Sequence, residues 1–164
     1  MINADEHTEA TTDLVKFLEA QRASVLAIVD GLDEEQLHTA VVPSGWTPIG
    51  LVEHLGYAER YWFQRVFTGT AVPLAWPAEE EAPPHATRRT SEVVLGFYRD
   101  QIARANKVLA STPLSAPPQE RHGNAEIPDL RYIVLHMIEE TARHAGHLDI
   151  ARELLDGRTG LGPR

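Results

Sequence analysis

Apolar side chains recur every three or four positions in four long stretches of the chain, a spacing that predicts amphipathic helices. The first helix is expected from about Thr12 to Asp30. Lys16, Glu19 and Arg22 fall on the face that is expected to be polar. A short capped turn of helix is expected to follow from Asp33 to Leu37. The face of the first helix expected to be buried carries Leu14, Phe17, Leu18, Val25, Ile28 and Val29.

The second helix has the clearest start in the sequence. Thr47 is a favourable N-cap residue, and Pro48 suits the first helical position because its missing N–H has no partner there. Gly69 marks the expected end. The proline-rich stretch from Gly69 to Arg89 predicts a long crossover connection. The expected buried stripe of this helix consists of Leu51, His54, Leu55, Ala58, Trp62 and Val66.

The third helix is expected to begin at Thr90 or Ser91 and to close before Pro113, and the fourth to run from about Asp129 to Asp156. No β-alternation or internal repeat stands out. We therefore expect an all-α four-helix bundle with two longer connections, forming a single domain over residues 1–164. The expected inner positions are Val94, Leu95, Tyr98, Ile102, Ala105 and Leu109 in the third helix and Leu130, Ile133, Val134, Met137, Thr141, Leu148, Ala151 and Leu155 in the fourth.

Composition narrows the classes of function. The chain has 164 residues and no cysteine, so disulfides, thiolate zinc sites and a cysteine nucleophile are excluded, and any metal must be held by nitrogen and oxygen. The net charge of -9 disfavours non-specific binding to nucleic acid or to anionic membranes. No apolar run approaches the roughly 20 residues of a membrane span. The acidic, polar start lacks the features of a signal peptide, so a cytoplasmic location is expected.

Polar side chains at expected core positions indicate a site. At about 100° per residue, His144 lies roughly 40° from Glu140 and His147 about 20° to its other side, so all three point the same way. His54 interrupts the apolar stripe of the second helix. A carboxylate and imidazoles inside a core are costly unless something neutralises or hydrogen-bonds them. If the two helices are neighbours, His54, Glu140 and His144 can bind one divalent metal ion with open coordination positions.

Each of these residues also has a simpler explanation. His54 alone is compatible with a core histidine that is hydrogen-bonded to a hydroxyl or a carbonyl. Glu140 is compatible with a surface carboxylate paired with Arg143, or with an i,i+4 pair to His144 on a solvated face. His147 is compatible with a group that supports a metal ligand, or with one that faces the substrate, rather than with a ligand itself. No H-E-x-x-H protease signature and no phosphate-cradling glycine loop occur in the sequence.

Two segments of the sequence resemble the DinB superfamily. They are residues 44–54, SGWTPIGLVEH, followed by Tyr61-Trp62, and residues 139–150, EETARHAGHLDI. The closer resemblance is to an actinobacterial branch of mini-circle-type members near the mycothiol-dependent maleylpyruvate isomerases. It extends over nearly the whole chain and implies an up-up-down-down bundle that binds a metal through one histidine of the second helix and two residues of the fourth.

The resemblance assigns roles to individual residues. His54 matches the first metal ligand and His144 the last. Many members have histidine at the position of Glu140. A glutamate also occurs at this position in the isomerase branch. His147 follows the ligands and is expected to act in catalysis by orienting a thiol or water. Zinc is the expected metal, with nickel, iron and manganese as alternatives.

Relatives with known activity transfer or add low-molecular-weight thiols, such as mycothiol or bacillithiol, to electrophiles. The resemblance therefore implies a metal-dependent thiol transferase that acts on a small electrophile, with a homodimer as the expected assembly. Tyr57, Tyr61, Trp62 and Arg143 are the expected pocket residues. Two alternatives stay open: a non-enzymatic metal-binding stress-response bundle that dimerises, and a metal-free scaffold in which the histidines hydrogen-bond to one another.

Overall fold

Every secondary-structure element in the described part of the chain is a helix. The computed structural model describes residues 4–72, 85–120, 122–123 and 126–160, with side chains from residue 13 onward. This confirms the expected all-α class. None of the helices in these ranges is long and apolar enough to cross a membrane. The helices are α1 Ala4–Val29, α2 Glu34–Leu37, α3 Pro48–Glu59, η1 Arg60–Phe67, α4 Ser91–Ser111 and α5 Leu130–Asp156.

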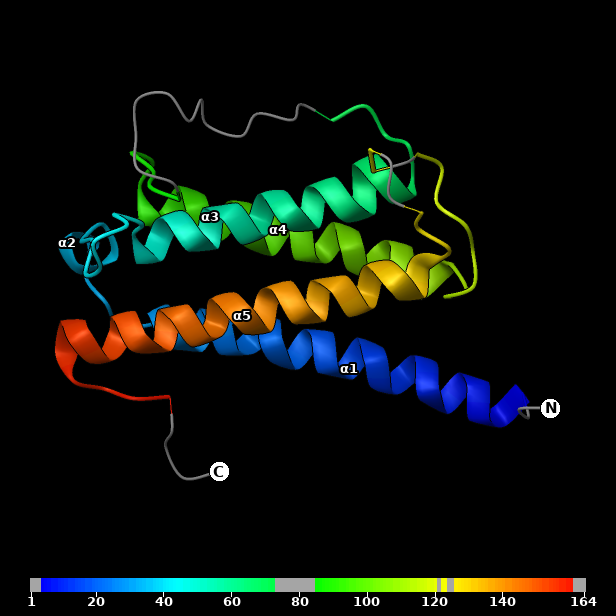
Figure 1. Cartoon of the computed structure of the whole chain (residues 1–164), viewed down its shortest axis with the longest axis horizontal. Helices are drawn as coiled ribbons and strands as arrows, with labels where there is room; N and C mark the ends of the chain where they lie inside the picture. The colour runs from blue at the N-terminus through cyan, green and yellow to red at the C-terminus, as the bar shows by residue number, and fades with distance from the viewer. Residues whose placement is uncertain (1–3, 73–84, 121, 124–125, 161–164) are drawn as a thin grey trace.

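The long helices form two layers, with α1 beside α5 and with α3, which continues into η1, beside α4 (Figure 1). α1 and α5 run in one direction, whereas α3 and α4 run in the opposite direction. The order along the chain is thus up-down-down-up, and the expected up-up-down-down order is wrong. The reason is that residues 30–47 and residues 112–129 each bring the chain back into the bundle at the end where the preceding long helix finishes. Only residues 68–90 join two parallel helices.

Local capping interactions set most of the helix boundaries. The Thr47 side chain accepts a hydrogen bond from the Gly50 N–H at 3.2 Å, with Pro48 at the first position of α3. Asp129 caps α5 in the same way, and Gly157 ends that helix in the left-handed region with φ 76°. These ends agree with the sequence prediction. α1 differs, because it begins at Ala4 rather than near Thr12.

The second predicted helix changes its winding part-way. After Glu59 the chain continues as a π-helical segment, η1, instead of a regular α-helix up to Gly69. Such wider turns are rare and occur frequently at functional sites. No pattern of apolar residues predicts them, since they depend on how the segment packs. The buried residues of η1 are Trp62, Phe63, Val66 and Phe67.

A buried ion pair lies between α1 and α3. Arg22 was expected on the polar face, but its side chain is 1% exposed and contacts the fully buried Glu59 through Nε–Oε1 and Nη2–Oε2 distances of 2.7 and 2.6 Å. Its Nη1 also donates to Glu19 at 2.7 Å and to Asn106 at 2.9 Å. Burial is the largest single effect and lowers the pKa of Arg22, but the attraction and hydrogen bonds of Glu59 and Glu19 together outweigh it, so the pKa is raised. Phe17, expected inside, is 62% exposed.

Candidate metal centre

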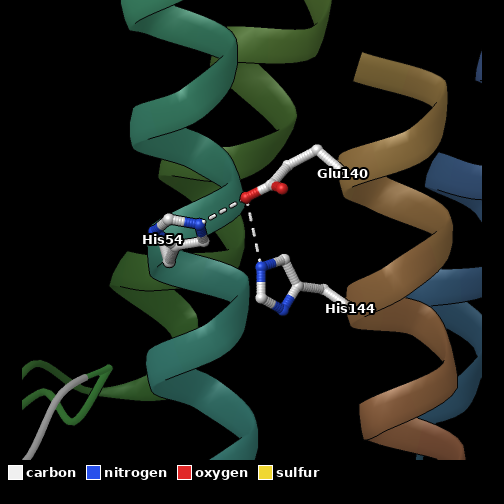
Figure 2. A group of neighbouring side chains, drawn as sticks. All are labelled: His54, Glu140 and His144. Carbon is white, nitrogen blue, oxygen red and sulfur yellow. Dashed lines mark hydrogen bonds and ion pairs between the residues drawn. The ribbon is translucent and has the colours of Figure 1, made fainter. Parts of the chain in front are cut away.

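The three predicted ligands meet between α3 and α5. Nε2 of His54, in the second turn of α3, lies 2.8 Å from Oε1 of Glu140. Nε2 of His144, one turn after Glu140 on α5, lies 3.2 Å from the same oxygen (Figure 2). One ligand atom from each of the three residues lies within 4.8 Å of the other two. The structure thus brings together side chains separated by 86 positions in sequence.

The site is sheltered but not sealed. The side chains of His54, Glu140 and His144 are 15%, 22% and 10% exposed. Hydrogen bonds from His144 and then from His54 hold the pKa of the Glu140 carboxyl well below its usual value, although burial opposes this shift. Glu140 therefore remains a carboxylate and supplies the one negative charge among the three donors.

The donor set and its spacing fit a divalent ion. In a tetrahedral site with ligand bonds of about 2.0–2.1 Å, neighbouring donor atoms lie roughly 3.3 Å apart. The two His-to-Glu140 distances, 2.8 and 3.2 Å, are slightly shorter than this. Only a small outward shift of the side chains is then needed to admit an ion. Two imidazoles and one carboxylate are also the donors of His₂Glu zinc enzymes.

His147 lies behind His144 rather than among the three donors. Its Nδ1 is 3.3 Å from Nδ1 of His144, which is the ring nitrogen that does not face Glu140 (Figure 2). On its other side the His147 ring centre lies 6.0 Å from that of Trp46. Burial, and then repulsion from His144, lower the pKa of His147. In this position His147 contacts the potential ligand atoms only through the His144 ring.

His85 belongs to the same cluster, although the sequence analysis did not select it. Its ring centre lies 4.3 Å from that of His54 and 6.0 Å from that of His144. Burial, and then repulsion from His54 and His144, lower the pKa of His85 to about 4, so the ring is neutral near pH 7. Helical periodicity provided no signal for His85, because it precedes α4 in a proline-rich connection.

A family model described as Mycothiol-S-transferase matches residues 13–157. The chain belongs to this family. Since it is a DinB-like family, the match confirms the resemblance seen in the sequence. The matched range includes His54, His85, Glu140, His144 and His147. A comparison with curated proteins finds no match.

In this Mycothiol-S-transferase family member, aromatic rings extend from the cluster of His54, Glu140 and His144 along α3 and α5. The ring centres of Trp62, on η1, and His136, on α5, are 4.4 Å apart. His136 lies one turn before Glu140. The Tyr61 hydroxyl lies 2.6 Å from Nδ1 of His122. The contact with His136 places Trp62 on the α5 side of η1, about two turns beyond His54, whereas Tyr61 contacts the connection that precedes α5.

The other two expected pocket residues are placed differently. Tyr57 packs against Phe97 of α4 with ring centres 4.9 Å apart, so its ring contacts the layer partner of α3. Arg143 is exposed on α5, and within the described part of the chain it forms no ion pair with Glu140. Glu140 pairs instead with the two histidines.

Proposed function

We propose that this protein is a divalent-metal-dependent transferase that moves a low-molecular-weight, mycothiol-like thiol onto a small electrophile. The observation that carries the proposal is the convergence of His54 and His144 on one oxygen of Glu140, in a member of a family described by mycothiol S-transfer. We propose these three side chains as the metal ligands. Zinc suits the donor set best, and nickel, iron and manganese bind similar donors.

The chemistry requires a thiol from outside the chain, since the sequence has no cysteine. A bound divalent ion supplies charge that stabilises thiolate, the nucleophilic form, near neutral pH. Three protein donors leave a position of a four-coordinate ion for an external ligand. In the transfer, the S–H bond of the cosubstrate breaks and its proton passes to solvent, while the sulfur forms a bond to the electrophilic carbon and the bond from that carbon to its leaving group breaks, the leaving group departing with the electron pair.

Each side chain of the site has a distinct role in this proposed reaction. Glu140 supplies negative charge, and Nε2 of His54 and Nε2 of His144, which hydrogen-bond to Glu140 in this structure, would bind the ion through their lone pairs once the ring protons are on Nδ1. His147 is proposed as a positioning residue: by accepting a hydrogen bond from Nδ1–H of His144, it keeps the Nε2 lone pair of that ring free for the ion. The sequence left this supporting role open beside direct orientation of the thiol or water.

The proposal is tested by measuring metal content and thiol conjugation for the wild type and for His54→Ala. His122→Ala, which removes an exposed histidine outside the three-residue cluster, is the matched control. We expect His54→Ala to lose both metal and conjugating activity, and His122→Ala to keep both. Full activity in His54→Ala would reject the mechanism.

The same experiment separates the alternatives. A chain that binds metal through His54 but never conjugates a thiol would support the non-enzymatic metal-binding bundle. Equal thermal stability with and without chelator would support the metal-free scaffold, because a bound ion stabilises the native state by about 2.7 kcal/mol at a hundred times its Kd. The homodimer stays a prediction, which light scattering on the purified protein would test.

A further inference from the structure

We propose that His85 is a fourth protein ligand of the ion that His54, Glu140 and His144 are proposed to hold. The inference rests on the proposed function for the presence of that ion. It concerns a residue from a non-helical segment, whereas the other three donors come from α3 and α5. Three independent features of His85 support it: the position of its ring, the conformation of its backbone and the contact of its carbonyl with α3.

The ring positions satisfy the geometric limit for a shared ion. With a metal–nitrogen bond of about 2.0–2.1 Å, the centre of a ligating imidazole lies roughly 3.2 Å from the ion, so two such centres are at most about 6.4 Å apart. His85 lies 4.3 Å from His54 and 6.0 Å from His144, and the latter two are 4.9 Å apart. All three pairs therefore meet the limit, but the ligand atoms that already lie within 4.8 Å of one another come from His54, Glu140 and His144, so the His85 ring must turn towards the ion to bind it. His147 instead approaches Nδ1 of His144, the nitrogen that does not face Glu140.

The backbone of His85 is held in an unusual conformation. Its φ of 54° is in the left-handed region, and it is the one non-glycine residue of the described chain with a positive φ. Histidine adopts this region more readily than most residues, but the conformation still costs energy unless the surroundings enforce it. Strained residues of this kind cluster at functional sites.

Contacts with the start of α3 enforce this conformation. The backbone N–H of Thr47 donates to the His85 carbonyl oxygen at 3.2 Å. A Cβ at Gly50 would overlap that same oxygen and crowd Ala86, so the approach depends on glycine at this position. The segment that carries His85 is thus fixed against the first turn of α3, one turn before His54.

A fourth donor changes how the site admits a ligand. Four protein donors fill a tetrahedral ion, which otherwise keeps a position for an external molecule. His54, Glu140 and His144 are held to one another by hydrogen bonds, whereas His85 approaches them from a connection outside the helices. His85 is therefore the donor that an incoming thiol can replace.

The test uses the full-length chain loaded with Co²⁺, whose visible spectrum reports its ligands. Affinity is measured by competition with a chelator for the wild type and for His85→Ala, His85→Cys and His54→Ala. His122→Cys is the control for a cysteine outside the cluster. We expect His85→Ala to weaken Co²⁺ binding at least about tenfold, the lower end of the loss seen even for groups that only support a ligand. We expect His85→Cys to show a sulfur-to-cobalt charge-transfer band, and His122→Cys to show none.

The outcomes separate this inference from the proposed function. Co²⁺ binding to His85→Ala within twofold of wild type, or no charge-transfer band in His85→Cys, would overturn direct ligation by His85. If His54→Ala still loses the ion in that case, the three-residue site stands and only the fourth ligand is rejected. If His54→Ala binds Co²⁺ as well as wild type, the metal site itself is rejected. Thermal unfolding of the metal-free variants checks that each one folds.

Discussion

His144 and His147 lie one turn apart on α5 with their Nδ1 atoms 3.3 Å from each other, while Nε2 of His144 faces Glu140 at 3.2 Å. The two nitrogens of the His144 ring thus have different partners. Histidines that bind metal through one nitrogen usually donate from the other, which fixes the ring and its tautomer. A carboxylate or a carbonyl is the common acceptor, whereas the group that lies against Nδ1 of His144 in this protein is a second imidazole.

Replacement of His147 should therefore weaken metal binding without removing a ligand. We expect His147→Ala to reduce metal affinity by about 10–100-fold, because His144 loses the contact that orients its ring. His147→Gln, whose side-chain oxygen can accept the same hydrogen bond, should recover part of the loss. Chelator competition measures both. Unchanged affinity in His147→Ala would show that His147 does not act through His144.

Removal of one member of the buried Arg22–Glu59 pair should destabilise the bundle strongly. Arg22→Met leaves the fully buried Glu59 without its partner, so we expect a loss of about 3–5 kcal/mol in the free energy of unfolding. The double variant Arg22→Met/Glu59→Met should lose less than the single variant, because no unpaired charge remains buried. Urea denaturation gives these values.

An exposed ion pair on the same helix provides the control. Lys16 and Asp13 are 3.2 Å apart with both side chains mostly in water, so Lys16→Met should change stability by no more than about 0.5 kcal/mol. If Arg22→Met were equally mild, burial of the charge would not be the dominant cost at this position.

Two glycine substitutions should act in opposite directions. Gly50→Ala places a methyl group against the His85 carbonyl oxygen, so it should displace the segment at residues 85–86, lower stability and weaken metal binding. Gly96→Ala lies on α4 with no atom within 4 Å of its new Cβ. It should stabilise the protein by up to about 1 kcal/mol through helix propensity alone. Melting temperatures and metal titrations distinguish the two cases, and a neutral Gly50→Ala would contradict the close packing of these backbones.

The stability of the metal-free protein should fall as the pH is lowered from 7 towards 4. The pKa values of His85, His136 and His147 are all lowered by burial, that of His85 to about 4. Each ring then binds a proton more readily in the unfolded chain than in the folded one. Its contribution to stability is present above the unfolded value of about 6.5 and is lost as the pH falls through the folded value.

Thermal unfolding in the presence of chelator, at intervals between pH 7 and pH 4, measures this slope. His85→Ala should make the pH dependence of stability less steep, because that variant lacks the histidine whose pKa is lowered to about 4. A melting temperature that is constant over this range in the wild type would show that the histidine cluster remains as accessible to protons in the fold as in the unfolded chain.

The starts of α3 and α5 and the choice of His54, Glu140 and His144 as candidate ligands follow from short-range rules in the sequence. The caps at Thr47 and Asp129 satisfy N–H groups within one turn of the helix, so residue type alone indicates where α3 and α5 begin. Glu140 and His144 share a face because they are four positions apart. His54 was conspicuous because a polar ring interrupts an apolar stripe, and a buried polar group requires a partner.

Only the tertiary structure decided the rest. Glu59, the partner of Arg22, is 37 positions away in the sequence. The spacing of apolar residues assigns Arg22 to a face of its helix, but it does not show whether a buried carboxylate from another helix lies opposite. The direction of α5 depends on the end at which residues 112–129 return the chain, which their length does not reveal. His85 joins the cluster through a left-handed backbone and a contact with Gly50. The local pattern of apolar and polar residues determines which face of a helix can be buried, whereas long-range packing determines which side chains that face contacts.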